Sequence, residues 1–320
     1  MRTVLFFRSY KEFHGGHLKV WNYFNHVLAS PVFEPRVWFS DQTTLSGDNP
    51  WRDSQHLIID KEHPIRPDVY FVGGANWRRL DRYPFADPGI PVINLIQHVR
   101  HADPDLRLSK FLHRKAIRIC VSSEVADELR ATGLTNGPLF VIPNAIDLPD
   151  LPATNGAHPH VDVLIAAGKE PDLGVQVADR LTQDGRIVDV LVERIPRADF
   201  LARMRAARTT VFLPHLTEGF FLPALEGMAL GTLVVCPDCI GNRSFCLPGQ
   251  NAFRPEYTVD GIVRDAEAAL GLHPDQARQL RENAVQTAAG HALSREREAF
   301  LDVLHNIDEL WRATNAKDQD

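Results

Sequence analysis

The chain has 320 residues, of which 44% are hydrophobic and 24% are charged, and its formal net charge is −6. This length is sufficient for two domains, and the composition is typical of a globular protein. The acidic balance argues against a general nucleic-acid-binding protein, and the acidic excess lies in residues 151–320.

The N-terminal sequence does not resemble a secretory signal, because its apolar run at residues 4–7 is short and lacks a cleavage site of small residues. No window approaches the roughly 18 apolar residues of a membrane-spanning helix. The four cysteines indicate reduced thiols, so we expect a cytoplasmic protein. Three of them have the spacing C-x2-C-x6-C, but a closed zinc site needs four ligands, and we expect no metal.

Apolar runs alternate with helical patterns in the first half of the chain. We expect strands at residues 3–7, 35–40, 68–74, 91–97, 116–122 and 139–144, and helices at residues 15–29 and 122–133. Short apolar strands that alternate with helices predict a parallel sheet covered on both faces.

A proline-containing stretch, residues 144–162, reads as a linker between two domains. Beyond it we expect strands at residues 161–168, 187–193, 209–214 and 232–237, and helices at 172–185, 196–207, 222–231 and 294–316. The predicted fold is α/β, with two doubly wound Rossmann-like domains facing a cleft. Ligands of such sheets bind outside the carboxyl ends of the strands.

The predicted domains are residues 1–148 and 149–295. A C-terminal helix at residues 296–320 would cross back to the first domain.

Two glutamates, Glu218 and Glu226, lie eight positions apart between an expected strand and the helix that follows it. Pro223 suits the first turn of that helix and Gly231 suits its end. The amides around residues 219–224 would then form a helix N-terminus, which favours anions. Two carboxylates beside an anion site suit a ligand with one anionic point and many hydroxyls, such as a nucleotide sugar.

This segment resembles the E-x7-E signature of retaining glycosyltransferases of the GT-B fold, the family-4-like enzymes. The resemblance covers most of residues 1–290 and is weaker over residues 30–90. Further motifs agree with it in order and spacing: "HGGH" (14–17), "AIRICVSSEVADEL" (116–129), "VIPNAID" (141–147) and "GTLVVCPDCIGN" (231–242).

The resemblance implies a retaining, metal-independent hexosyltransferase that acts in polysaccharide or glycoconjugate synthesis. It would move a sugar from a nucleotide diphosphate-sugar, its co-substrate, to a hydroxyl acceptor on a glycan or a lipid-linked molecule. No cofactor and no nucleic acid would be involved. The second domain would bind the donor and the first domain would bind the acceptor.

The resemblance also implies roles for individual residues. Glu226 would bind the ribose hydroxyls, Glu218 a hydroxyl of the donor sugar, and His98 the donor sugar itself. Other positions would hold the sugar and the diphosphate through backbone amides or close backbone approach: Gly219, Phe220, Phe221, Leu222, Gly15 and Gly16.

The basic residues depart from the family pattern. Lys169 stands where the family has an arginine, and residues 173–174 are Leu-Gly where Lys-Gly is expected. One cation for the diphosphate is therefore missing or comes from elsewhere, and Arg243 is a candidate. Phe221 also replaces the last glycine of the family's E-G-F-G.

Each candidate has a plainer interpretation. A helix or loop glutamate can be solvated, a Gly-Gly pair can be an ordinary turn, a histidine can belong to the core, and a lysine or arginine can be a surface cation. The whole protein likewise has two alternative functions, a non-catalytic nucleotide-sugar-binding protein and a nucleotide-sugar epimerase on the same fold.

Residues 100–118 carry more basic than acidic residues, with leucines and a phenylalanine between them. A basic amphipathic segment of this kind could lie on an anionic membrane, which would make the protein peripheral to the inner face of that membrane. The alternative is a solvated helix face of the first domain.

Overall fold

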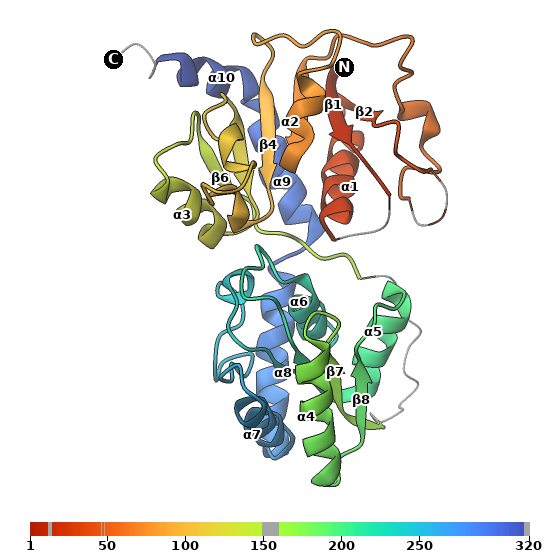
Figure 1. Cartoon of the computed structure of the whole chain (residues 1–320), viewed down its shortest axis with the longest axis vertical. Helices are drawn as coiled ribbons and strands as arrows, with labels where there is room; N and C mark the ends of the chain where they lie inside the picture. Colours follow the sequence, from red (N-terminus) through yellow and green to blue (C-terminus); the bar gives the residue numbers. More distant parts are fainter. Residues whose placement is uncertain (12–14, 46, 48, 149–159, 317–320) are drawn as a thin grey trace. The chain divides into compact units, whose positions relative to one another are not determined.

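The computed structural model describes residues 1–11, 15–45, 47, 49–148 and 160–316. It divides the chain into two compact units (Figure 1). Unit 1 comprises Met1–Asn144 and Leu293–Asp320, and unit 2 comprises Ala145–Ala292. The part of the predicted linker at residues 149–159, and His14 of the "HGGH" motif, lie outside the described residues.

Unit 1 contains a six-stranded parallel sheet with the strand order β2-β1-β3-β4-β5-β6. Three of its inner strands, β3 to β5, are buried along their whole length, as expected for a parallel sheet covered by helices. The strands are β1 (Arg2–Arg8), β2 (Phe33–Phe39), β3 (Val69–Gly73), β4 (Val92–Ile96), β5 (Ile117–Cys120) and β6 (Leu139–Val141).

Helices from both ends of the described chain pack in unit 1. Ser122 caps α3 by accepting a hydrogen bond from the Val125 amide at 3.2 Å, as its position predicts. Figure 1 shows α9 in the same unit as the sheet, where it contacts α1. The helices are α1 (Gly15–Leu28), α2 (Trp77–Leu80), α3 (Ser123–Ala131), α9 (Leu293–His305) and α10 (Ile307–Ala316).

A buried charged cluster joins α9 to α1. The Lys19 ammonium forms an ion pair with Glu296, and His26 Nε2 lies 2.9 Å from the other oxygen of that carboxylate. All three side chains are almost fully buried. Next to them, the Phe300 ring of α9 packs edge-on against Tyr23 of α1 at 4.7 Å between centroids. The C-terminal segment is thereby part of the core of unit 1.

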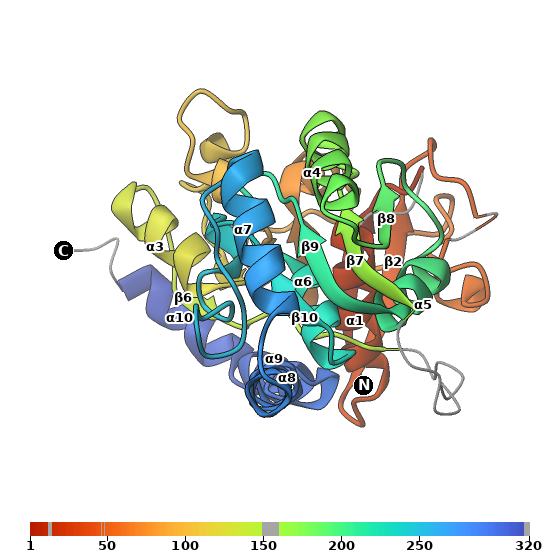
Figure 2. The ribbon, with the colours of Figure 1, turned by 90° about the horizontal axis from the view of Figure 1, so that it is seen from below.

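Unit 2 contains a four-stranded parallel sheet with the order β10-β9-β7-β8 (Figure 2). The strands are β7 (Val161–Ala166), β8 (Val188–Leu191), β9 (Ala207–Phe212) and β10 (Leu233–Val235). The helices are α4 (Pro171–Gln183), α5 (Arg197–Ala206), α6 (Leu222–Ala229), α7 (Val259–Leu270) and α8 (Pro274–Ala289). The expected fold class, α/β with two Rossmann-like domains, is confirmed.

The alternative considered for residues 100–118, a solvated helix face, is wrong, whereas the membrane contact of this segment stays a prediction. The segment forms turns with two short 3-10 helices, Val99–His101 and Ser109–Phe111, before it enters β5. Arg118, counted with the solvent-facing basic residues, is fully buried instead. Its guanidinium donates hydrogen bonds to five backbone carbonyls, among them those of Leu112 and Arg114 at 2.7 and 2.6 Å. No helix in the described ranges is long and apolar enough to cross a membrane.

The buried cluster predicts a strong effect of Glu296→Gln on the stability of unit 1. In this variant the carboxylate charge is lost, and the Lys19 ammonium is left buried without an opposite charge. Losing one partner of a buried ion pair costs about 3–5 kcal/mol. All five tryptophans belong to unit 1. Urea denaturation followed by tryptophan fluorescence therefore measures the free energy of unfolding of this unit.

Glu298→Gln is the matched control, because Glu298 lies on the same helix and is exposed. We expect the control to stay within about 0.5 kcal/mol of the wild type. Equal stability of the two variants would contradict the importance of the cluster.

Candidate functional site

The candidate donor-site residues lie in unit 2 where β7 and β9 end. Lys169 follows β7, Glu218 lies in the loop after β9, and Glu226 lies in α6, which that loop enters. Both strands are parallel neighbours, so their carboxyl ends lie at the same edge of the sheet. The predicted placement of Glu218 in a loop and Glu226 in a helix is confirmed, with Pro223 in the first helical turn.

Lys169 and Glu218 form an ion pair across this edge. Their side chains are 39% and 19% exposed. The Lys169 ammonium also lies 5.2 Å from the centroid of the Phe221 ring, within the range of a cation–π contact. The sequence prediction therefore named two residues that the fold brings together, although they are far apart along the chain.

Glu226 is buried and is held by Arg197 at the start of α5. The Arg197 Nε and Nη2 atoms both donate to Glu226 Oε1, at 3.0 and 2.5 Å, and Nη2 also donates to the Asp147 carbonyl at 2.7 Å. Burial raises the pKa of the Glu226 carboxyl, and the charge and hydrogen bonds of Arg197 oppose that rise. Among the described residues no hydrogen bond ends on the second oxygen, Oε2, which can therefore accept one from a ligand hydroxyl.

Arg197 is a site residue that the sequence analysis missed. It is the first residue of a helix and follows Pro196, and nothing at that position indicates a partner in α6. Only the folded structure shows that this cation neutralises Glu226.

The predicted anion site at the start of α6 has fewer unused donors than expected. The Phe221 amide donates to the Gly241 carbonyl at 2.8 Å, and the Leu222 amide donates to the Phe220 carbonyl at 3.2 Å. The rings of Phe220 and Phe221 are buried, and Phe220 stacks on Phe245 at 5.1 Å. The aromatic residues between the two glutamates therefore hold the loop in place.

Gly241 fixes the position of this loop through close backbone approach. A Cβ atom added at Gly241 would lie 2.7 Å from the Phe220 nitrogen and 2.8 Å from the Glu218 carbonyl oxygen. Both of these are backbone atoms, which cannot move aside without displacing the loop. The strand-end segment after β10 is therefore packed directly on the segment that carries Glu218.

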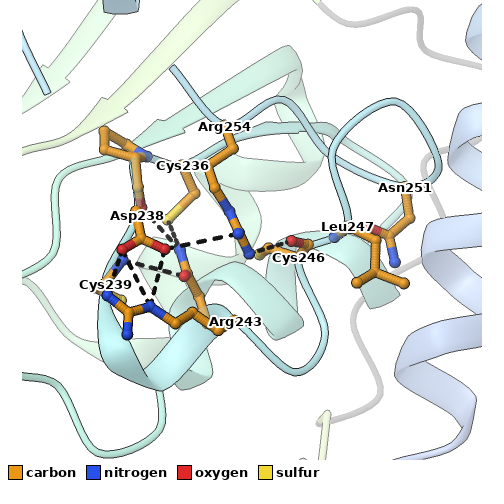
Figure 3. Close-up of polar contacts among 10 residues, drawn as sticks. Cys236, Asp238, Cys239, Arg243, Cys246, Leu247, Asn251 and Arg254 are labelled. Carbon is orange, nitrogen blue, oxygen red and sulfur yellow. Dashed lines mark hydrogen bonds and ion pairs between the residues drawn. The ribbon is translucent and has the colours of Figure 1, made fainter. Parts of the chain in front are cut away.

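Arg243 is engaged by Asp238 (Figure 3). Its Nε atom lies 3.1 Å from both carboxylate oxygens, and its Nη2 atom lies 2.6 Å from Oδ2. Arg254 approaches the same carboxylate at 3.6 Å, and the Arg243 contact lowers the pKa of Asp238. For Arg243 to bind a diphosphate, as the sequence analysis considered, it would have to leave Asp238.

The cysteines near this segment are buried free thiols. Burial raises the pKa of Cys239 to about 12, and Cys236 accepts a hydrogen bond from the Asn242 side-chain amide at 3.2 Å. In the part of the chain that the structure describes, no group of three or more His, Cys, Asp or Glu residues could hold a metal ion. These thiols pack in the core.

The predicted residues of unit 1 lie near the carboxyl edge of its sheet. Gly15 and Gly16 begin α1, and the Gly16 carbonyl accepts hydrogen bonds from Arg8 at 3.5 Å and from the Gln97 amide at 3.3 Å. A Cβ atom at Gly16 would meet the Gln97 side chain at 3.4 Å, whereas one at Gly15 would meet nothing. His98 follows β4, and its Nδ1 atom accepts a hydrogen bond from the Arg100 amide at 3.1 Å.

A cavity of about 800 Å³ opens at this edge of unit 1. Gly16 and Gln97 contribute to its wall, together with residues at the ends of β1, β2 and β3. Its lining is strongly basic, which the sequence analysis did not anticipate, because these residues come from the segment where the family resemblance is weakest and from the end of β1. The cations are Arg8, Lys61, Arg78, Arg79 and Arg82.

Comparison with known proteins gives the fold class. No family model matches the sequence, and no curated protein matches it in sequence. Among solved structures, the chain is similar to sucrose-phosphate synthase of Thermosynechococcus elongatus, with 12% identity, a TM-score of 0.69, and coverage of 98% of this chain and 100% of the other.

Two further structures are similar over nearly their whole length. HepE of Anabaena, in complex with UDP and glucose, has 15% identity and a TM-score of 0.68, with coverage of 96% and 100%. A glycosyltransferase of Rickettsia africae has 12% identity and a TM-score of 0.65, with coverage of 96% and 98%. The chain therefore has the GT-B fold, which the sequence resemblance predicted.

The Arg197–Glu226 contact predicts a pH-dependent stability defect in Arg197→Met. Without Arg197, burial raises the folded-state pKa of Glu226 further above its ordinary value of 4.5. A raised carboxyl pKa favours the protonated form in the folded state, so the loss grows as pH rises above that value. We expect a loss of about 2–3 kcal/mol at pH 7 and a smaller loss near pH 4.5.

Urea denaturation followed by far-ultraviolet circular dichroism at both pH values measures this difference. The double variant Arg197→Met with Glu226→Gln removes the buried charge and should recover much of the loss at pH 7. A defect of equal size at both pH values would show that Arg197 acts through packing and not through the charge of Glu226.

Proposed function

We propose that this protein is a retaining glycosyltransferase that moves a sugar from a nucleotide diphosphate-sugar to a hydroxyl acceptor. The observation that carries the proposal is the pair of carboxylates at the strand ends of unit 2, Glu218 beside Lys169 and Glu226 beside Arg197. They lie in a GT-B fold, and their spacing along the chain resembles that of the E-x7-E motif. The alternative of solvated glutamates does not fit Glu226, whose side chain is 9% exposed.

In this proposal Glu226 binds the nucleotide ribose. Arg197 holds one carboxylate oxygen and favours the ionised form of the group against the effect of burial, which leaves Oε2 to accept hydrogen bonds from vicinal hydroxyls. A charged acceptor makes shorter and stronger hydrogen bonds than a neutral one. Arg197 is therefore a positioning residue for Glu226.

Glu218 and Lys169 would act nearer to the reacting bond. Glu218 would accept a hydrogen bond from a hydroxyl of the donor sugar, while Lys169 would neutralise charge that develops on the departing diphosphate. Retention would follow from attack on the same face that the diphosphate leaves, with a diphosphate oxygen taking the proton of the acceptor hydroxyl. We propose that this chemistry needs no metal ion and serves polysaccharide or glycoconjugate synthesis.

The ligands named for similar structures make UDP the first nucleotide to test. HepE of Anabaena was solved with UDP and glucose and with UDP-glucose, and MnaA of Staphylococcus aureus was solved with UDP. These names belong to proteins of at most 15% identity, so the base and the sugar of this chain's donor are open to experiment.

A second candidate is a protein that binds nucleotide sugars without turnover. The observation that favours it is the small number of hydrogen-bond donors available to a diphosphate. The amides of Phe221 and Leu222 already donate to backbone carbonyls, and Arg243 is held by Asp238. Such a protein would bind a nucleotide as tightly as an enzyme but would release no sugar to any acceptor. A nucleotide-sugar epimerase would instead convert the donor in the absence of an acceptor.

Calorimetric titration with UDP, GDP, ADP and dTDP, without added metal, tests the donor site. We expect micromolar binding of one nucleotide and a loss of at least about tenfold in Glu226→Ala, because two hydrogen bonds to a charged group are removed. Glu282→Ala, which changes a carboxylate outside this site, is the control and should bind as the wild type does. If no nucleotide binds, the transferase proposal fails.

The stereochemical prediction is tested with the donor that this titration identifies. Proton NMR of the transferred sugar should show the anomeric configuration of the donor, and EDTA should leave the initial rate unchanged. A product of opposite configuration would contradict retention. A rate that EDTA abolishes would contradict metal independence.

A further inference from the structure

We propose that the basic cavity of unit 1 is the acceptor site and that the acceptor carries a phosphate ester or a similar oxyanion beside its reactive hydroxyl. The proposal rests on the proposed transferase function, because it names the class of acceptor. The cavity lies where ligands of parallel sheets bind, beyond the carboxyl ends of β1, β2, β3 and β4.

The lining of the cavity has an unbalanced charge. Among the described lining residues the one acidic side chain, Asp41, is paired with Lys61. Arg78, Arg79 and Arg82 form no ion pair with any described carboxylate, and Arg79 donates only to the Asn76 side chain, at 3.2 Å. The nearby positive charge of Arg82 and burial both lower the pKa of Arg79, burial being the larger cause. An anion in the cavity would relieve this repulsion.

Arg8 is the strongest indication of a missing partner. It ends β1, is 8% exposed, and lines the cavity, yet its Nε atom is buried without a hydrogen-bond partner among the residues that the structure describes. Burial lowers the pKa of Arg8 to about 10, which still leaves the guanidinium charged at neutral pH.

Arg118 shows how the same unit treats a buried arginine that needs no ligand. Five backbone carbonyls accept hydrogen bonds from its two terminal nitrogens, and it is not among the residues that line the basic cavity. Among the described residues, the hydrogen-bond partners of the Arg8 guanidinium are the Gly16 carbonyl and a ring nitrogen of His17. The Nε atoms of both arginines are buried without a described partner, so the difference lies in the terminal nitrogens: those of Arg118 are surrounded by carbonyls, whereas Arg8 lines an open basic cavity.

A cavity lined by several arginines favours a ligand that carries a phosphate. The planar guanidinium fork matches the oxygens of phosphate, and hydrogen bonds between charged groups are about twice as strong as neutral ones. A neutral glycan would leave these cations uncompensated. Ser9, Ser40 and Asn76 in the same lining supply uncharged groups for the hydroxyls of the acceptor.

Calorimetric titration with glucose 6-phosphate and with glucose provides the first test, because the two probes differ only in the phosphate. We expect the phosphate ester to bind at least about tenfold more tightly than glucose. The double variant Arg79→Gln with Arg82→Gln should lose at least about tenfold of that affinity, whereas Arg130→Gln, an exposed arginine of α3, should bind as the wild type does. Equal affinity for the two probes would overturn the proposal.

The source of the phosphate is distinguished with vesicles. Sedimentation with phosphatidylcholine vesicles, with and without phosphatidic acid, tests a lipid-borne phosphate in the same variants. Binding to phosphatidic acid that the double variant loses would assign the oxyanion to a lipid headgroup. Binding that the double variant retains would place the membrane contact elsewhere and leave the soluble ester as the source.

UDP titration of the same variants separates this proposal from the donor site. We expect the double variant to bind UDP as the wild type does, and Glu226→Ala to bind glucose 6-phosphate as the wild type does. Loss of UDP affinity in the double variant would overturn the proposal, because the arginines would then hold the donor diphosphate. If no nucleotide binds but the phosphate ester still binds through Arg79 and Arg82, the transferase function fails and the anion site remains.

Discussion

The ion cluster of Lys19, Glu296 and His26 determines how unit 1 is assembled. A charge removed from water needs a partner of good geometry, and here the partner of α1 comes from a helix at the opposite end of the chain. The cluster forces α9 to lie on α1, where Phe300 joins the aromatic core. Unit 1 is therefore built from segments far apart in the chain, and its core includes Phe300 of α9.

The same constraint explains the other buried charges. Glu226 is balanced by Arg197, and the terminal nitrogens of Arg118 donate to five backbone carbonyls. Arg8 differs because it lines a basic cavity and has, among the described residues, only two hydrogen-bond partners, the Gly16 carbonyl and His17. The other buried charges named here are compensated within the chain, and we infer that the Arg8 guanidinium is compensated by a bound ligand. The inference of an anionic ligand depends on that contrast and not on the number of arginines alone.

Most of the fold could be predicted from the sequence, because continuous apolar runs and helix-end residues such as Ser122, Pro223 and Gly231 act locally. The placement of Glu218 and Lys169 in loops after strands, and of Glu226 in a helix, could be predicted for the same reason. What could not be predicted depends on contacts between distant segments. Arg197 pairs with Glu226, which is 29 positions away, and the Gly241 carbonyl accepts a hydrogen bond from the Phe221 amide. The solvated helix face considered for residues 100–118 does not form, and Arg118 of that segment is instead buried against backbone carbonyls, among them that of Asn136.

The two candidate sites have opposite electrostatic character although both lie at the strand ends of parallel sheets. In unit 2 each carboxylate has one cation, so the site is nearly neutral and presents carboxylate oxygens to hydroxyls. In unit 1 the cations of the described lining outnumber its one carboxylate, so the site presents donors to an oxyanion. A neutral site does not repel a nucleotide diphosphate, and a basic site does not retain a neutral sugar strongly. Charge alone would thus direct a phosphorylated acceptor to unit 1, while the hydroxyl-rich part of a donor finds its hydrogen-bond acceptors in unit 2.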